Sequence, residues 1–209
     1  GHELPAVSLP GFKQAHPRLP HPTAADVARL LAEGNAYLGE MRRLAKSAQP
    51  RSNSYHARAV VEFIEPGSQD LSVLHVQLMT TRFEWRGHDQ VRPLAVAYDW
   101  LHDRWTVEQR TQLRSKLAEG CEYLVQVIRT ERLSPYNVFL YNAPFQALVA
   151  CALALYGDDV RGESVMRFTH DLWKQRVLPV WRQIMGRHGG WHEGGEYVGI
   201  GIGQAVYQV

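Results

Sequence analysis

The stretch that decides the fold reads Ala147-Leu148-Val149-Ala150-Cys151-Ala152-Leu153-Ala154-Leu155. It lies in a helical run from Asn142 to Tyr156 that has almost no polar face. A helix that is apolar all round is buried all round. The run therefore predicts an inner helix covered on every side. Such a helix suits a two-layer ring or solenoid better than a four-helix bundle.

The segments on both sides of this run predict further helices, each with one apolar face. Upstream, Thr106 to Gln109 forms a capping box that opens a helix ending near Arg129. Downstream, Gly157-Asp158-Asp159 ends the inner helix, and the next apolar stripe contains Val165, Phe168, Leu172 and Val177. Helix after helix with short connections predicts an all-α chain of antiparallel hairpins.

The start of the chain has a different character. Five prolines within residues 1–22 exclude helix and predict an extended N-terminal arm, so that residues 23–209 form the helical domain. Thr23 and Asp26 have the spacing of a capping box. We expect one helix to run from there to Gln49-Pro50.

Residues 50–70 leave two interpretations open. The run from Val60 to Ile64 fits a short strand, or a helix end closed by Pro66-Gly67. A helix is expected after Ser68. The glycine at 87 then separates it from the next helix, in whose first turn we place Pro93.

Composition excludes several classes of protein. The 209 residues are within the range of one domain, and the net charge of +2 comes without a basic run, which argues against a nucleic-acid partner. No apolar stretch is long enough to span a bilayer. The ten histidines lack the spacing of a zinc helix, so we expect neither a metal nor a cofactor. Cys121 and Cys151 lie in apolar helical patterns, as buried thiols or as a disulfide.

A second informative stretch is Gly189-Gly190-Trp191-His192-Glu193-Gly194-Gly195-Glu196-Tyr197. Its glycines let the backbone leave a helix and let bulky groups approach the main chain. Tyr197 would then project from the first turn of a new helix, as a proton donor or acceptor. A helix–helix corner with Trp191 as a core plug is the alternative.

Four segments together resemble the heparinase II/III-like polysaccharide lyases, in the same order along the chain. They are His16-Pro17-Arg18-Leu19-Pro20 before the Thr23 helix, Arg92 to Leu101, Tyr136 through Asn142 to Ala154, and residues 189–197. The resemblance implies an (α/α) toroid, normally followed by a C-terminal β-sandwich, that cleaves acidic polysaccharides by β-elimination. Complete family members are several times longer. We therefore expect an incomplete toroid, whose exposed apolar helix faces favour self-association.

The resemblance also implies roles for individual residues. Tyr197 matches the tyrosine that acts as Brønsted acid or base, and it needs hydrogen-bonding or cationic neighbours to act as a base near neutrality. Asn142 matches the residue that binds the substrate carboxylate, and Asn137 shares that role. Some family members have histidine beside this asparagine, where this chain has Ala143. His192 or His188 is then the candidate replacement.

The remaining candidates contact the substrate or support the loop. Trp191 forms either a sugar-stacking wall or a core plug, and Glu193 orients the loop by capping the next helix. Arg86, with Arg82 and Arg92, is a candidate for binding an acidic sugar, although arginines are more often simply solvated.

Two other functions stay open. One is a glycoside hydrolase on a related scaffold, with Glu193, Glu196 and Asp99 as candidate carboxylates. The other is a non-catalytic carbohydrate-binding module. Because the chain begins Gly1-His2 rather than with Met, we expect a processed or trimmed protein. We expect it to be periplasmic or secreted. Alginate, heparinoids and hyaluronan-like chains all remain candidate substrates.

Overall fold

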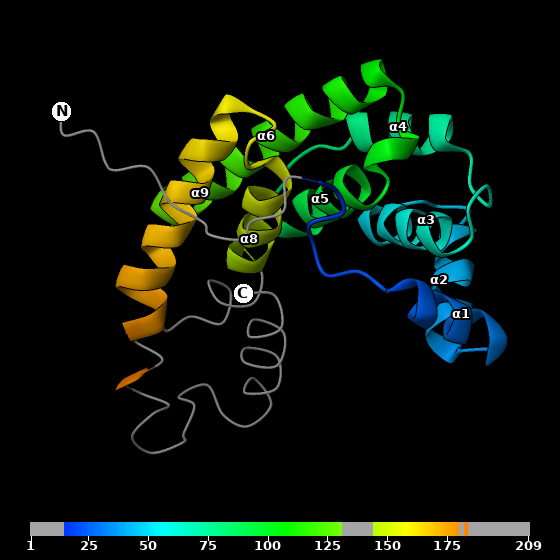
Figure 1. Cartoon of the computed structure of the whole chain (residues 1–209). Helices are drawn as coiled ribbons and strands as arrows, with labels where there is room; N and C mark the ends of the chain where they lie inside the picture. Colours follow the sequence, from blue (N-terminus) through cyan, green and yellow to red (C-terminus); the bar gives the residue numbers. More distant parts are fainter. Residues whose placement is uncertain (1–14, 131–143, 180–181, 184–209) are drawn as a thin grey trace.

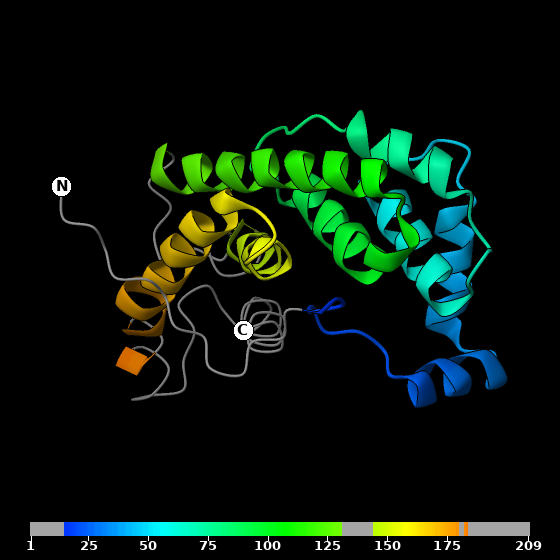
Figure 2. The ribbon, with the colours of Figure 1, turned by 45° about the horizontal axis from the view of Figure 1, so that its top comes forward.

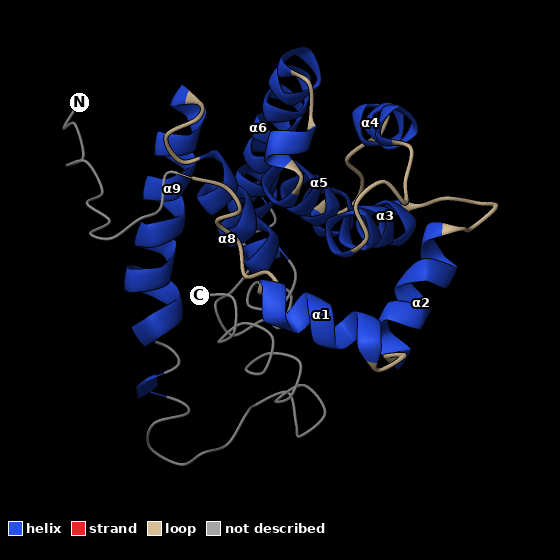
Figure 3. Ribbon diagram, turned by 45° about the vertical axis from the view of Figure 1, so that its right-hand side comes forward, coloured by secondary structure: helices blue, strands red, loops and turns tan. Residues whose placement is uncertain are grey.

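The structure is a computed structural model, and it describes residues 15–130, 144–179 and 182–183. Every regular element in these residues is a helix, as the blue ribbons of Figure 3 show. The predicted all-α class is therefore confirmed for this part of the chain. None of the described helices combines the length and the apolar character needed to cross a membrane.

The helices follow one another along the chain, and most of the described connections between them are short (Figure 1). In chain order they are α1 (Ala24–Ala32), α2 (Ala36–Ala45), α3 (Ser52–Ile64), α4 (Leu71–Met79), α5 (His88–Trp100), a 3₁₀ turn at His102–Arg104, α6 (Val107–Thr130), α8 (Pro144–Leu155) and α9 (Val160–Leu172). A π-helical turn, Trp173–Val177, continues α9.

From α3 onward the helices alternate between two rows. In one row α3 packs on α5 and α5 packs on α8, and in the other α4 packs on α6 and α6 packs on α9. Figure 2 shows the long α6 passing over α5 and α8. Consecutive helices also pack on one another across the rows, as α5 does on α6, α6 on α8, and α8 on α9. The described part is thus a two-layer array of helical hairpins.

The row of α3, α5 and α8 carries most of the core. The prediction that the run around Ala147–Leu155 is buried all round is confirmed, because only Ala150 and Leu153 of α8 keep partial exposure. The sequence pattern marked one apolar side on α5, but this helix is also buried from Val91 to Asp99 apart from a partly exposed Arg92. Helices α5 and α8, which are neighbours in this row, are therefore both enclosed.

The predicted helix starts at Thr23 and Thr106 are confirmed. The side chain of Thr23 accepts from the backbone N–H of Asp26 (3.2 Å), and Asp26 accepts in return from the N–H of Thr23 (3.0 Å). Thr106 and Gln109 make the same reciprocal pair at 3.1 Å in each direction. Both boxes satisfy helix N–H groups that have no partner inside the helix.

The expectation of a single helix from Thr23 to Pro50 is wrong. The helix ends just before Gly34, which has a φ of 57°, a backbone conformation that glycine adopts at no steric cost. A second helix, α2, then begins with Asn35 as its N-cap. The Asn35 side chain accepts from the N–H of Tyr37 (2.9 Å), so it caps a new helix. Local turn chemistry outweighed the continuing apolar pattern here.

Two further details differ from the sequence expectations. Residues 60–64 are not a strand but the last turns of α3, which resolves the open choice in favour of helix. Pro93 lies in the second turn of α5 rather than the first, because the helix starts at His88 after the left-handed Gly87 (φ 71°). A proline at this position cannot donate to the carbonyl group of Asp89.

The two cysteines join the rows. Cys121 of α6 and Cys151 of α8 are both fully buried, and their Cα atoms lie 6.0 Å apart. This separation is typical of a disulfide. The structure pairs them, so of the two forms that the sequence left open, the disulfide is present.

The carboxylate of Asp99 holds the end of the arm against α5. Asp99 is completely buried, and it accepts from the backbone N–H groups of Arg18 (2.9 Å) and Leu19 (2.8 Å) and from Nδ1 of His16 (2.6 Å). A buried carboxylate without such donors is strongly unfavourable. A substrate cannot reach Asp99, which was a candidate carboxylate of the hydrolase hypothesis, so its role is structural.

Asp158, in the loop after α8, binds the same arm segment from the other side. Its carboxylate accepts from Nε2 of His16 (2.7 Å), from Nη2 of Arg18 (2.7 Å) and from the hydroxyl of Tyr98 (2.8 Å). We call His16, Arg18, Tyr98, Asp99 and Asp158 the arm latch. It joins residues far apart in the sequence, from the arm, from α5 and from the end of α8.

Arg18 also closes the C-terminal end of α8. Its Nη1 donates to the carbonyl groups of Ala154 (3.1 Å) and Tyr156 (2.8 Å), in the last turn of that helix. Carbonyl groups there lack partners within the helix and attract cations. Arg18, which is 135 or more residues away in sequence, thus supplies hydrogen-bond donors to carbonyl groups at the end of the inner helix α8.

Both ring nitrogens of His16 face carboxylates, so the ring must be an imidazolium to donate to both. Burial lowers the pKa of His16, but the hydrogen bonds to Asp158 and Asp99 outweigh it and raise the pKa above 6.5. Burial also favours a higher pKa for Asp158, but hydrogen bonds from His16, Tyr98 and Arg18 lower it to about 2. The latch is a charged assembly.

The raised pKa of His16 makes stability depend on pH. The group stabilises the fold when protonated, so its contribution is complete below pH 6.5 and is lost as the pH rises through the higher folded pKa. We expect His16→Asn to lower the free energy of unfolding by about 2–4 kcal/mol near pH 6, because it leaves the buried Asp99 and the partly buried Asp158 without their shared donor.

Urea unfolding of both proteins between about pH 5 and pH 9 measures this difference. The deficit of the variant should shrink above pH 6.5, as the wild-type ring loses its proton. Taking the difference in unfolding free energy between the two proteins cancels the contributions of other titrating groups, such as His56. A deficit that stays constant over the whole range would contradict a protonated latch.

Candidate functional site

Most residues singled out from the sequence lie outside the described part of the chain. Arg86 is described, and its guanidinium lies over the ring of its neighbour Trp85, 5.0 Å from the ring centroid. The other seven have no described position: Tyr197, Asn142, His192, Asn137, Trp191, Glu193 and His188. Their roles therefore stay predictions, and the site has to be built from the described residues.

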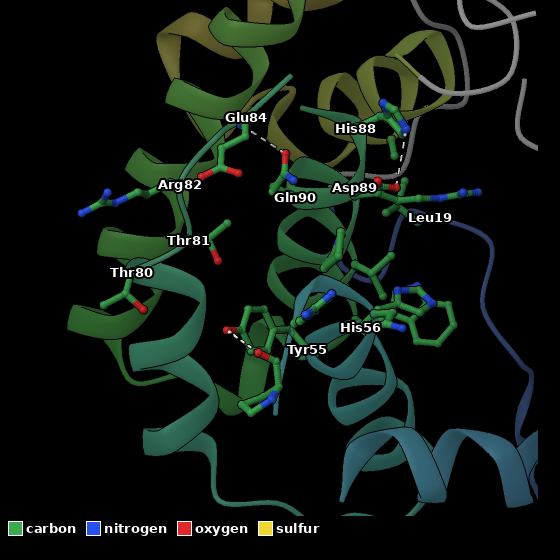
Figure 4. Close-up of a pocket in the computed structure, with 18 of the residues that line it drawn as sticks. Leu19, Tyr55, His56, Thr80, Thr81, Arg82, Glu84, His88, Asp89 and Gln90 are labelled. Atoms are coloured by element: carbon green, nitrogen blue, oxygen red, sulfur yellow. Dashed lines mark hydrogen bonds and ion pairs between the residues drawn. The ribbon is translucent and has the colours of Figure 1, made fainter. Parts of the chain in front are cut away.

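The described residues form a cleft of about 1390 Å³ between α3, α5 and the segment that joins α4 to α5. In Figure 4, Tyr55 and His56 of α3 lie across the cleft from Glu84, His88 and Gln90. Leu19 and Pro20 of the arm also line it, and so does Ala150 of α8. The arm latch thus positions one wall of this cleft.

Arg92 of α5 is the notable group in the cleft. It is partly buried and lines the cavity, yet among the described residues its guanidinium makes no hydrogen bond or ion pair. Desolvation lowers its pKa below 12.5, and the charge of Asp89 offsets this only in part. A desolvated charge without a partner destabilises a fold. It is therefore a functional-site candidate.

Three residues that line the cleft have a buried ring nitrogen without a hydrogen-bond partner among the described residues. They are His56 (Nδ1), His88 (Nδ1) and Trp100 (Nε1). Buried polar atoms in native proteins normally have a partner. Three such exceptions in residues of one cavity make it the candidate ligand site of the described part of the chain.

The two histidines are electrically neutral near pH 7. Burial, helped by the charge of Arg92, lowers the pKa of His56 to about 4. Burial also lowers the pKa of His88, with Arg86 and Arg92 acting in the same direction and Asp89 against it. A neutral imidazole offers one donor and one acceptor. Apart from these neutral rings, the cleft is lined by the cations Arg51, Arg82 and Arg92 and by the carboxylates of Glu84 and Asp89.

This arrangement suits an anionic ligand of modest size, such as a carboxylate. An arginine binds a carboxylate through paired N–H groups, and such bonds are strongest where water is excluded. The N–H of a tryptophan or of a neutral histidine can donate to an anion without adding charge. Neutralising a carboxylate in this way also prepares the carbon beside it for loss of a proton.

The sequence offered little to identify His56, His88 and Trp100. The helix that carries His56 was left undecided between strand and helix, and His88 and Trp100 lie at the two ends of α5, outside its regular apolar pattern. Arg92 was named beside Arg86, but nothing local separates the two. The available signal was weak: Arg92 directly precedes Pro93, inside residues 91–98, which are otherwise apolar or weakly polar.

One further cluster has the side chains to hold a metal. Ligand atoms of His16, His102 and Asp158 lie within 4.8 Å of one another. However, both nitrogens of His16 already donate to carboxylates, and Arg18 places a positive charge on Asp158. A cation would have to displace that arginine and the proton of His16. These three residues therefore fit the charged latch better than a metal centre.

Comparison with protein-family models, with curated proteins and with solved structures found no match to this chain. The family resemblance seen in the sequence thus remains a prediction. What the chain does has to be argued from the cleft.

A substitution of Arg92 tests whether its charge is held for a ligand. We expect Arg92→Met to raise the free energy of unfolding by roughly 0.5–2 kcal/mol, because it removes a desolvated charge that Asp89 compensates only in part. Chemical denaturation without ligand provides the measurement.

Arg58→Met is the matched control. Arg58 is also partly buried, but it donates to the carbonyl group of Ala45 (2.9 Å) and to Gln77 (2.7 Å). Its loss should cost about 1–3 kcal/mol, since buried acceptors lose their donors. If Arg92→Met destabilised the protein as much as Arg58→Met, Arg92 would be a structural residue.

Proposed function

We propose that the chain belongs to a polysaccharide lyase that cleaves a uronate-containing polysaccharide by β-elimination. The observation that carries the proposal is Arg92, which lines the cleft and has no hydrogen-bond or ion-pair partner among the described residues. In the same part of the chain, the buried ring nitrogens of His56, His88 and Trp100, which also line the cleft, lack partners too. A uronate carboxylate has the charge and the acceptor atoms that could pair with the Arg92 guanidinium.

The arrangement of the helices supports the same proposal. Two rows of alternating helices, with α3, α5 and α8 in one and α4, α6 and α9 in the other, are what an arc of an (α/α) toroid would require. The cleft is lined from α3, α5 and α8, which all belong to the same row. A toroid would place these helices around its centre, where a polysaccharide chain can lie.

In the proposed reaction the carboxylate of the uronate binds Arg92 and the N–H groups beside it. Its negative charge is then compensated, which makes the proton on C5 more acidic. A base removes that proton, the electron pair forms the C4–C5 double bond, and the C4–O bond to the departing sugar breaks. The departing oxygen receives a proton from an acid. No water is consumed.

The family resemblance assigns the proton transfers to Tyr197, with His192 or His188 assisting. It assigns Asn142 and Asn137 to the carboxylate, where their amides would add donors to those around Arg92. Asn142 lies two residues before the start of α8, whose Ala150 lines the cleft. This sequence distance is short enough for the asparagine to belong to the same site.

The disulfide supports a proposal for the cellular compartment of the protein. Cys121 and Cys151 are paired, and disulfides persist in oxidising compartments and are uncommon in the cytosol. This supports a periplasmic or secreted protein, where acidic polysaccharides are also encountered.

The lyase reaction gives a product that identifies it. We expect incubation with alginate, heparin or hyaluronan to generate an unsaturated uronate, followed by its ultraviolet absorbance. Tyr197→Phe should abolish the product. Arg92→Met should lower kcat/KM roughly 10²–10³-fold, as expected for loss of a charge-stabilising donor.

Arg58→Met should keep turnover near the wild-type value, because Arg58 does not line the cleft. Polysaccharide whose carboxyl groups have been reduced to alcohols should not be cleaved. Cleavage that leaves saturated products would indicate hydrolysis and contradict the proposal. Full activity in both single variants, Tyr197→Phe and Arg92→Met, would also contradict the proposal.

A further inference from the structure

Two histidine rings lie face to face where the arm meets the helices. The ring of His16, in the arm, stacks on the ring of His102, in the 3₁₀ turn after α5. Their centroids lie 3.8 Å apart, and their planes differ by 11°. Two imidazolium ions in this position repel each other. The bound arm therefore favours a pair in which one ring is charged and the other is neutral.

The neighbours of His16 place the charge on that ring. Its two nitrogens contact Asp99 of α5 (2.6 Å) and Asp158 of the loop after α8 (2.7 Å). The His16 side chain is only 4% exposed, so water does not replace these carboxylates. Burial and the charge of Arg18 lower the pKa of His16, but the two carboxylates outweigh them and raise it above 6.5.

His102 has the opposite surroundings. Its ring contacts the carboxylate of Asp103 (3.1 Å), which is largely exposed to water. Arg110 of α6 donates to the carbonyl group of His102 (3.3 Å), so a further cation lies nearby. Burial lowers the pKa of His102 below 6.5, and the charges of His16 and Arg110 act in the same direction, while Asp103 and Asp158 act against it. His102 is therefore neutral where His16 is charged.

Other groups around the pair keep their charge near neutral pH. Hydrogen bonds outweigh burial and lower the pKa of Asp158 to about 2, so it stays ionised. Burial and the bond to Asp158 raise the pKa of Tyr98 above 10, so its hydroxyl keeps its proton. Arg114 of α6, which donates to the carbonyl group of Asp158 (3.3 Å), is always charged. The response to pH therefore comes from the two rings.

We propose that this histidine pair is a pH switch, which keeps the arm docked while His16 carries a proton and His102 does not. Alkali removes the proton of His16, and a neutral ring has one N–H group for two carboxylates. Acid adds a proton to His102 and brings two like charges face to face. Either change favours release of the arm, which no single titrating group would produce.

Docking is strongest near pH 6.5, where both rings titrate once the arm is released. His16 binds its proton more tightly in the docked arm. Its contribution is complete below pH 6.5 and is lost as the pH rises through its docked pKa. His102 binds its proton more weakly when the arm is docked. Its contribution is complete above pH 6.5 and is lost as the pH falls through its docked pKa.

The switch acts on the cleft through the next residues of the arm. The N–H group of Leu19 donates to Asp99 (2.8 Å), and Leu19 and Pro20 line the cavity. Release of the arm therefore removes part of one wall, whatever ligand the cleft binds. The inference goes beyond the proposed function because it needs no polysaccharide, so its failure would leave the lyase proposal standing.

Amide hydrogen exchange of Leu19 between about pH 5 and pH 8.5 measures docking, because this N–H group is bonded to Asp99 in the docked arm. After correction for the intrinsic exchange rate, its protection should be greatest near pH 6.5 and fall at least about threefold towards each end. Leu124, buried in α6, is the reference for opening of the whole fold. Protection of Leu19 that simply follows that of Leu124, or shows no maximum, would overturn the switch.

Two variants separate the limbs of this profile. His102→Phe keeps a ring against His16 but cannot take a proton, so it should abolish the fall below pH 6.5 and keep the fall above it. His75→Phe is the matched control. Burial also lowers the pKa of His75, but this residue lies on α4 beside Trp105, and its loss should leave both limbs in place. An acid limb that persists in His102→Phe would rule out the stacked pair as its cause.

Proton NMR of the imidazole rings tests the switch in the unaltered chain. His16 should titrate above pH 6.5 and His102 below it, and the reverse order would contradict the proposal. Addition of Zn²⁺ tests the alternative that His16, His102 and Asp158 hold a cation. If Zn²⁺ at about pH 8 raises the protection of Leu19 above its value near pH 6.5, these residues form a metal site and the proton switch is overturned. Protection that does not respond to Zn²⁺ supports the switch.

Discussion

The described structure depends on one buried carboxylate. Asp99 lies in the middle of the array, on a helix enclosed on nearly every side, and its oxygens accept from the backbone and a ring of the arm. This interaction fixes where the arm lies, because a carboxylate at that depth requires several donors. Asp158 repeats the arrangement on the other side of His16. The result is an irregular segment locked between two helices.

The same latch shapes the cleft. Residues 16–18 bind Asp99 and Asp158, and the next two, Leu19 and Pro20, form part of the cavity lining. A weakened latch would therefore alter the cleft as well as the stability. Two arginines, one in the arm latch and one in the cleft, play opposite roles. Arg18 satisfies a helix end and a carboxylate, whereas Arg92 has no such partner among the described residues.

Local signals in the sequence predicted local structure well. Capping boxes at Thr23 and Thr106 were correct, because the residues that form them are three apart. The apolar run around Cys151 was correctly identified as an enclosed helix. The break at Gly34 was missed, because a glycine and a capping asparagine outweigh an apolar pattern that continues on both sides. Pro93 was misplaced because the left-handed Gly87 starts α5 a turn and a half earlier.

The sequence by itself determined the all-α class, the enclosed inner helix and most helix starts, since periodicity and capping act over a few residues. Only the tertiary structure decided which polar residues are structural and which belong to the cleft. Asp99 and Arg92 lie seven residues apart on one helix, and either fits a catalytic role by residue type. Their difference lies in partners contributed by distant segments: the arm encloses Asp99, and no described segment pairs with Arg92.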